Sequence, residues 1–382
     1  MKILHTSDWH LGQLFMGQSR EEEHKAFLNT LLEIIKKENI DLLLITGDIF
    51  DTATPPIYAQ KLYFNFLSAL KETNCRKCII TAGNHDSISF LESFKEILSL
   101  LSIEIVEKEG KIFEFEDFTL LAVPYLREKY ITKFISDQNY EDHEKTYIKA
   151  IKDIYTDLYK QALKSGKKIV ATGHLSVVEA KKSGSERELY IGNLSSIESS
   201  FFDIFDLTLL GHFHKAQKIG KTIYCGSPIP LSFNEAKDKK SIFIVDTKNF
   251  KIKDIEIKPF RKLIEIKGDY EKIEKELLET NSLKEAWCKI VIQGDKRSES
   301  FIQSLNETAK KKNIKILAIQ YEKEFENILK DIPISQGVSN LSPLEIFDRK
   351  LKEEIEDREL EKKLKILYEK ILREVETQED TV

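Results

Sequence analysis

The chain has 382 residues, of which 41% are hydrophobic and 32% charged, so it is long enough for two domains and can bury a sizeable core. Its formal net charge of −5 argues against a protein that coats nucleic acid by bulk positive charge, because such binding rests on basic patches. Four cysteines in this length exclude a disulfide scaffold, and without an apolar run of about 18 residues the sequence predicts no transmembrane helix.

From residue 1 to about 260, short β-branched runs alternate with amphipathic stretches, which is typical of a layered α/β or α+β domain. Segments 2–7 and 41–47 predict strands buried on both faces, and 20–39, with acids early and lysines late, predicts a helix. Further helices are expected at 56–71, 89–101 and 142–165. Later strands, which suggest a second and more antiparallel sheet, are expected at 168–172, 207–210, 217–224, 241–247 and 250–258.

Beyond residue 260 the pattern changes to β-α-β-α-β. The segments are 263–268, 270–280, 287–294, 299–313 and 314–322, which predict a small separate module. After the polar linker PISQGVSNL, Ser342, Pro343 and Glu345 form a helix-start signal. The tail helix carries a narrow apolar stripe among dense charges, so it either folds back on its own domain or lies on a partner helix.

Cys75 and Cys78 form a lone C-x-x-C, a spacing found in zinc and redox sites. A closed zinc site needs four ligands and the chain has no second such pair, so we expect ordinary thiols. The first ten residues, MKILHTSDWH, contain no apolar leader or cleavage site. We therefore expect a reducing, cytoplasmic location.

Five expected strands end in oxygen and nitrogen donors, in the motifs SDWH, TGDIFD, GNHD, ATGH and LGHFH. Imidazole and carboxylate together suit divalent ions such as manganese, iron or zinc. Seven donors suffice for two ions if one carboxylate bridges them, the standard arrangement for displacement at phosphorus. The candidate ligands are Asp8, His10, Asp48, Asn84, His174, His212 and His214.

Taken singly, these motifs have ordinary explanations. A lone His10 or His174 is more often a satisfied polar residue, and a Gly-Asp or Gly-His pair is usually a turn. Of the other histidines, we expect His24 and His143 to be solvated beside charged helices, and His5 to be structural within the first strand.

The ordered set Asp-x-His, Gly-Asp, Gly-Asn-His-Asp, Gly-His and Gly-His-x-His resembles the calcineurin-like metallophosphoesterases, with no ligand missing. GDIFDTATPP, YIGNLSSI, LGHFHKAQ, YCGSPIPLSF and LSPLEIFDRKL extend the resemblance over essentially the full chain to the bacterial SbcD family of nuclease subunits. The resemblance implies an α+β fold with a four-layer α/β/β/α sandwich over 1–260. It also implies a DNA capping domain over 261–335 and a helical tail over 336–382.

The same resemblance implies two manganese ions, with magnesium or another divalent ion as alternatives, bridged by Asp48. One ion would be completed by Asp8, His10 and His214. The other would be completed by Asn84, His174 and His212.

His85 would then be the catalytic residue, protonating or stabilising the leaving oxygen. Asp86 would anchor its turn rather than bind metal. Archaeal and eukaryotic relatives typically carry a second histidine just after the Gly-Asp motif, where this chain has Asp51. That departure leaves the role of Asp51 open, with a supporting hydrogen bond to His85 as one explanation.

DNA contacts are expected from Lys181, Lys182 and Arg187 in the loop AKKSGSER, for which a solvated surface loop is an equal alternative. Helices near 56–72 and 89–101 would form a homodimer, unless their apolar residues are simply core. The tail would bind the coiled-coil root of the SbcC ATPase, and the lack of a Walker motif agrees with an ATPase on another polypeptide.

The implied activity is manganese-dependent 3'–5' double-strand exonuclease and hairpin or single-strand endonuclease action in DNA repair, recombination and replication. Two rival functions remain open. One is a phosphoesterase acting on small phosphodiesters or phosphomonoesters, which could stop near residue 260. The other is a non-enzymatic adaptor that has lost its metals, which the intact ligand set disfavours.

Overall fold

The computed structural model describes residues 1–127, 140–183, 196–280, 285–294 and 299–322, together with Leu351 and Leu364. By its contacts the chain divides into two compact units, Met1–Gln320 and Tyr321–Val382. The predicted linker and the helix start at Ser342 lie outside the described residues, as does Arg187. Leu351 and Leu364, both on the predicted tail stripe, are helical, and Leu351 is buried.

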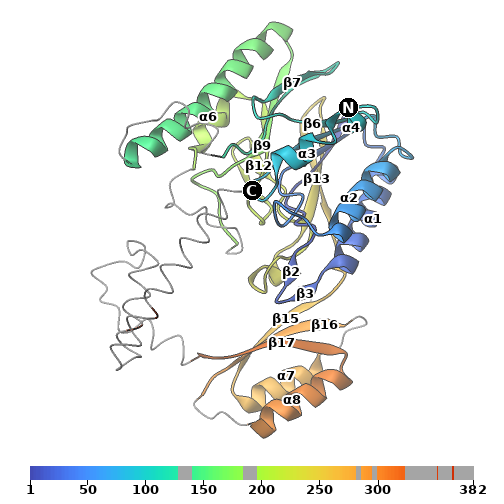
Figure 1. Ribbon diagram of the computed structural model, residues 1–382, viewed down its shortest axis with the longest axis vertical. Coiled ribbons are helices and arrows are strands. Elements are labelled where there is room, and N and C mark those ends of the chain that lie inside the picture. Colours follow the sequence, from blue (N-terminus) through green and yellow to red (C-terminus); the bar gives the residue numbers. More distant parts are fainter. Residues whose placement is uncertain are drawn as a thin grey trace. The chain divides into compact units, whose positions relative to one another are not determined.

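The first of two six-stranded sheets has the order β14-β13-β1-β4-β5-β6 (Figure 1). Its parallel part consists of β1 (Lys2–Thr6), β4 (Leu42–Thr46), β5 (Lys77–Thr81) and β6 (Ile103–Ile105). The antiparallel strands β13 (Ser241–Asp246) and β14 (Lys251–Glu256) extend it beyond β1. The prediction that 241–247 and 250–258 belong to the second sheet was wrong, because β13 pairs with β1 from Lys2↔Asp246 to His5↔Phe243.

The second sheet has the order β11-β12-β10-β9-β8-β7. Its strands are β7 (Lys111–Glu114), β8 (Phe118–Val123), β9 (Lys168–His174), β10 (Leu207–Gly211), β11 (Gln217–Ile219) and β12 (Thr222–Tyr224). The four central strands are parallel and only the edges β7 and β11 are antiparallel, so the expected antiparallel character was wrong. The predicted strand 217–224 is a hairpin, turning at Gly220 with φ +56°.

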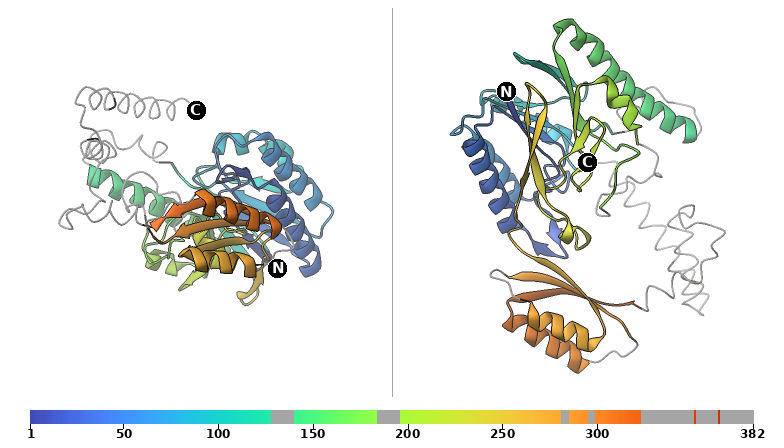
Figure 2. Two further views of the ribbon diagram at one scale, coloured as in Figure 1. Left: turned by 90° about the horizontal axis from the view of Figure 1, so that it is seen from below. Right: turned by 180° about the vertical axis from the view of Figure 1, so that it is seen from behind.

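Helices cover the outer faces of both sheets (Figures 1 and 2). On the first sheet these are α1 (Glu21–Glu38), α2 (Ile57–Leu70), α3 (Ile88–Glu92) and α4 (Lys95–Ser99). On the second they are α6 (Tyr140–Ala162) and the 3₁₀ turns Leu163–Ser165 and Ser199–Ile204. Alternate strand residues face different cores: Leu4 packs toward α1 and α2, whereas Ile3 packs between the sheets.

The predicted helix 89–101 is interrupted. Ser93 follows α3, and its hydroxyl donates to the Phe90 carbonyl at 2.6 Å, a side-chain bond that competes with helix continuation. α4 then begins after Phe94.

The small module matches its predicted order of elements. It comprises β15 (Leu263–Gly268), α7 (Tyr270–Glu279), β16 (Ala286–Ile292), α8 (Glu299–Lys311) and β17 (Ile314–Tyr321), with sheet order β15-β16-β17. Both helices lie on one face of this sheet (Figure 1). The side chain of Asp269 caps α7 by accepting from the Lys272 amide at 2.9 Å. The Trp287 ring stacks on Phe15 from the hairpin of β2 (Leu14–Phe15) and β3 (Gln18–Ser19).

Among the helices within the described residues, none combines the length and apolar character needed to cross a bilayer.

His24 is fully buried, which corrects its predicted solvated position. It precedes Phe27, Leu28 and Leu31 at helical spacing, so it shares their buried face of α1 despite the charged residues beside it. Burial lowers the pKa of His24 to about 3. The ring therefore stays neutral in the folded protein at neutral pH. The side chain of His143 lies outside the described part of α6.

This buried imidazole should make stability depend on pH. The unfolded chain binds a proton near pH 6.5 and the folded chain only near pH 3, so the stability of the native state falls as pH drops through that window. Relative to His24→Phe, the wild type should lose about 2 kcal/mol between pH 7 and pH 5. Urea denaturation of both proteins at the two pH values measures this difference, and equal losses would contradict a neutral buried His24.

Gly211, at the end of β10, marks a point where the two sheets approach each other closely. A Cβ there would lie 2.0 Å from the Thr46 carbonyl oxygen of β4. Gly211→Ala should therefore force the strands apart and destabilise the protein by about 1–3 kcal/mol. Gly268→Ala is the matched control, because the atoms nearest to its Cβ belong to the flexible Lys272 side chain rather than to backbone. Chemical denaturation should separate the two variants, and equal stabilities would show that the strands do not constrain each other.

Candidate metal centre

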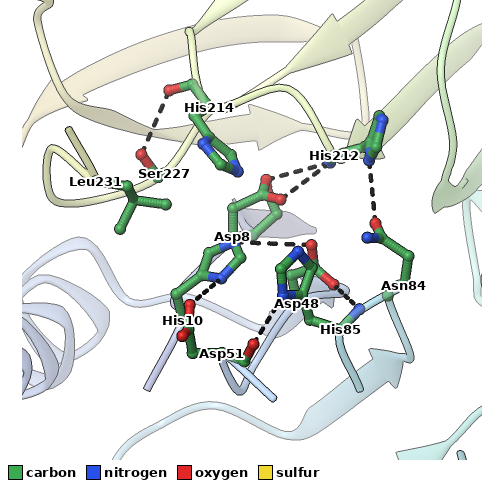
Figure 3. Close-up of polar contacts among 12 residues, drawn as sticks. Asp8, His10, Asp48, Asp51, Asn84, His85, His212, His214, Ser227 and Leu231 are labelled. Carbon is green, nitrogen blue, oxygen red and sulfur yellow. Dashed lines mark hydrogen bonds and ion pairs between the residues drawn. The ribbon is translucent and has the colours of Figure 1, made fainter. Parts of the chain in front are cut away.

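The predicted ligands lie at the carboxyl ends of five strands from both sheets. β1, β4 and β5 run parallel in the first sheet, and β9 and β10 run parallel in the second. β4 contacts both β9 and β10, so the five ends meet. Six of the seven predicted ligands are buried, while Asn84 is partly exposed. Figure 3 shows the labelled aspartates, histidines and Asn84 gathered around one centre.

Four of these residues have backbone conformations that L-residues rarely adopt. The φ angles are +53° at Asp8, +46° at His10, +49° at Asp48 and +112° at His212. Each such residue costs about 1–3 kcal/mol unless its surroundings hold it. Here the Asp8 amide donates to the Gly47 carbonyl and the His10 amide to the Asp48 carbonyl, both at 3.0 Å. The fold thus holds strained turns where the donor side chains converge.

Asp8, His10 and His214 form a first group, in which one donor atom from each lies within 4.8 Å of the others. The Asp8 carboxylate accepts from the Ser7 hydroxyl and, at 3.1 and 3.2 Å, from the His212 amide. His10 Nε2 is buried and has no hydrogen-bond partner within the described part of the chain. A buried imidazole nitrogen without a hydrogen-bond partner, next to carboxylates, is suited to bind a metal ion.

A second group of Asp8, Asp48 and His174 meets the same 4.8 Å criterion. His174 Nδ1 lies 2.8 Å from the Thr46 carbonyl, which can only accept, so Nδ1 carries the proton. Nε2 then lies 3.2 Å from Asp48 Oδ2 and 3.0 Å from Asn84 Oδ1. The same asparagine oxygen is 3.1 Å from His212 Nδ1.

Asp48 belongs to the second group and also lies beside the first, since its Oδ2 is 3.7 Å from His10 Nε2. Burial favours the neutral acid, but the neighbouring His174, His85 and His10 outweigh it and hold the pKa of Asp48 well below its usual range. Burial and the nearby Asp48 charge instead raise the pKa of Asp8. Burial lowers the pKa of His174, yet the Asp48 charge prevails and raises it to about 9.

His85 is held by two bonds at the edge of this centre. Its amide donates to Asp48 Oδ1, and its Nδ1 donates to the Asp51 carbonyl, each at 2.8 Å. The Asp51 carboxylate lies 3.1 Å from His10 Nδ1. Asp51 therefore contacts two histidines, one through its backbone and one through its side chain. His10, Asp51 and His85 also form a third group within 4.8 Å.

The Asp86 carboxylate faces backbone amides. It accepts from Gly83 at 2.8 Å, Phe50 at 3.0 Å and Ile49 at 3.2 Å, which ties the β5 turn to the β4 turn. Burial, together with the Asp48 charge, raises the pKa of Asp86 to about 6.

Three further residues beside the centre were not identified from the sequence. Glu235 Oε1 lies 3.3 Å from His214 Nδ1, and buried Lys240 pairs with the same carboxylate. Arg127 donates to the Asp86 carbonyl at 3.3 Å. None of the three stands in a motif that marks a ligand, so only the folded chain brings them here.

The predicted DNA-contact loop is described up to Ser183. Lys181 and Lys182 are exposed. The Lys181 amide donates to the Gln217 side chain at 2.7 Å, and the Ser183 hydroxyl lies 3.1 Å from Glu235 Oε1. This start of the loop therefore lies next to the metal centre.

The four cysteines are free thiols. Burial raises the pKa of the Cys75 thiol to about 11, and its sulfur contacts the Lys77 carbonyl. Burial also raises the pKa of Cys78 well above its usual value. Neither belongs to a candidate metal group among the described residues. His5 is buried in β1, with Nε2 2.9 Å from the Thr46 hydroxyl.

Comparisons with known proteins place this centre in a family. A model described as calcineurin-like phosphoesterase matches residues 1–216, and one described as type 5 capsule protein repressor C-terminal domain matches residues 259–354. The chain is 34% identical to the D subunit of nuclease SbcCD from Escherichia coli K12, over 96% of this chain and 97% of that protein. It is 31% identical to the protein of the same name from Staphylococcus saprophyticus, over 73% of this chain and 75% of that protein.

A crystal structure of TT1561 of Thermus thermophilus aligns with 67% of this chain and 99% of its own at 12% identity, with a TM-score of 0.42. The family assignment rests on the two matched models and the sequence relatives. The expected fold class is thereby confirmed, since the chain has the mixed α and β fold of that superfamily. The chain belongs to the calcineurin-like phosphoesterases and, within them, to the SbcD family of nuclease subunits.

Proposed function

We propose that this phosphodiesterase nuclease is a manganese-dependent DNA nuclease with 3'–5' double-strand exonuclease and hairpin or single-strand endonuclease activity. It would act in the cytoplasm on DNA ends, together with the SbcC ATPase. The observation that carries the proposal is the convergence of seven donor side chains from five strand ends, with His85 beside them. A site built in this way fits two divalent ions rather than one.

The geometry supports a specific division of ligands. The Asp8, His10 and His214 group would hold one ion. Asn84 Oδ1, facing both His174 and His212, supports the other site. Asp48 would be the bridge, because its Oδ2 lies between His10 and His174. When bound, the ions supply Lewis acidity toward the phosphoryl oxygens and activate water.

His85 would act on the substrate rather than on a metal. Because the Asp51 carbonyl fixes the proton on Nδ1, Nε2 is the nitrogen that can exchange a proton with the leaving oxygen. The bond from the His85 amide to Asp48 keeps this ring at a set position relative to the proposed bridge. Asp51 would support both His85 and His10.

DNA binding would involve Lys181, Lys182 and Arg187, with the module over 261–335 as a capping domain. The exposed positions of Lys181 and Lys182 next to the centre support this role. A homodimer would form through α2, α3 and α4. Exposed Ile57 in α2, Ile97 in α4 and Leu100 directly after α4 support the dimer, since their apolar side chains are uncovered in one chain.

The tail over 336–382 would bind the coiled-coil root of SbcC. Two observations support a dedicated partner-binding segment: the second family model extends to residue 354, and the relatives' name describes one component of a multi-subunit nuclease.

The decisive variant for the proposed chemistry is His85→Ala. It should retain two manganese ions per chain and lose about 10²–10⁴-fold of cleavage rate on hairpin-ended DNA, because only the proton-transfer group is removed. Manganese titration and cleavage assays, with and without SbcC and ATP, measure both properties. The wild type should be stimulated by SbcC.

His24→Phe is the matched control, since it removes a buried histidine of α1 that lies outside the metal groups. At pH 7.5 it should cleave like the wild type. If the wild type bound two ions and hydrolysed a small phosphodiester but left DNA intact under every condition, the nuclease assignment would fall. Full activity in His85→Ala would remove the role assigned to that residue.

A further inference from the structure

Glu235 is a buried carboxylate directly behind His214. It lies on the 3₁₀ turn Asn234–Lys237 and is 0% exposed. Its Oε1 is 3.3 Å from His214 Nδ1. The Nδ1 atoms of the other three candidate histidine ligands face a backbone carbonyl (His174), an amide side chain (His212) and a partly exposed acid (His10). His214 differs, because its Nδ1 faces a fully buried acid.

Several donors fix this carboxylate in place. Oε2 accepts from the Leu231 amide at 3.1 Å and the Ser227 hydroxyl at 3.3 Å, and it forms an ion pair with Lys240. The Ser183 hydroxyl adds a bond to Oε1 at 3.1 Å. A carboxylate with this many donors has little freedom to turn away from the imidazole.

The same cluster also holds the backbone of His214. Its carbonyl accepts from Lys240 Nζ and from the Ser227 amide, both at 3.1 Å. Figure 3 shows Ser227 beside this carbonyl, with the His214 ring pointing away toward Asp8. Three buried residues, Ser227, Lys240 and Glu235, thus hold both the backbone and the ring of His214.

A neutral imidazole binds a metal through one nitrogen and carries a proton on the other. A carboxylate at Nδ1 requires the proton there, which leaves the lone pair on Nε2 for the ion. Lys240 makes this arrangement possible, because a buried carboxylate without a counter-charge would be strongly destabilised.

We propose that Glu235, held by Lys240, is a positioning residue that fixes the tautomer and orientation of His214 for the ion shared with Asp8 and His10. This rests on the two-ion site of the proposed function. It adds a prediction that the two ions respond differently: loss of Glu235 should weaken the ion at His214 and leave the ion at Asn84, His174 and His212 unchanged.

The test is manganese titration of the full chain by calorimetry. Glu235→Gln should lower the affinity for one of the two manganese ions by about 10- to 100-fold, the loss typical when the hydrogen-bond partner of a metal-bound histidine is removed. Made in an Asn84→Ala background, which removes a ligand of the other ion, the same change should weaken the ion that remains. In a His10→Ala background it should have no effect on the remaining ion. Excess manganese should restore DNA cleavage by the single variant.

Glu23→Gln is the matched control, because Glu23 is a buried carboxylate paired with Arg20 and Arg261 and lies outside the candidate metal groups. It should leave both manganese affinities unchanged. If Glu235→Gln does not fold, Glu235→Leu combined with Lys240→Met removes the acceptor without leaving a buried charge unpaired, and the same selective loss is expected.

Two results would overturn the proposal: unchanged affinity for both ions, or equal weakening of both, which would indicate a general structural role. A wild type that binds fewer than two ions would instead overturn the proposed two-ion function on which this inference rests.

Discussion

The carboxylate of Asp48 is the point on which the rest of this site depends. Asp48 follows β4 and has a left-handed backbone conformation. Its carboxylate accepts a hydrogen bond from the His85 amide and lies beside two imidazoles, His10 from the first sheet and His174 from the second. Such a residue can exist only if the two sheets approach closely, and Gly211 permits that approach. The close approach of β4 and β10 therefore constrains the strand ends and the glycines between them.

Without ions, the centre holds the carboxyl groups of Asp8 and Asp48 close to each other and to several imidazoles, all buried away from water. The raised pKa of Asp8 and of His174 both follow from this crowding. A pair of divalent cations would relieve repulsion among the carboxylates and displace the extra protons, so ion binding and proton release should be linked. Around the donors, Asp51 and Glu235 contact imidazole groups and Asp86 contacts backbone amides. In the proposed assignment, these acids would form a supporting layer rather than further ligands.

Much of this was predictable because strand-end motifs are local in sequence. The seven donors and His85 each stand within six residues of the end of an apolar run, and the alternating pattern of the small module was equally clear. What failed depended either on the pairing of distant strands or on which face of a helix is buried. The pairing of β13 with β1 joins residues more than 200 positions apart in sequence, which a local pattern cannot specify. His24 has charged neighbours in sequence, although it lies on the buried face of α1. Glu235 and the Asp51 carbonyl act through contacts that leave no sequence pattern.

The proposed chemistry depends on Asp48 bridging two ions in one chain. Crystals of the full chain grown with manganese, with diffraction recorded at the manganese absorption edge, test it most directly. Two anomalous peaks per chain are expected, both within bonding distance of Asp48, one also contacting His214 and the other Asn84. A single peak, or two peaks of which only one contacts Asp48, would contradict it.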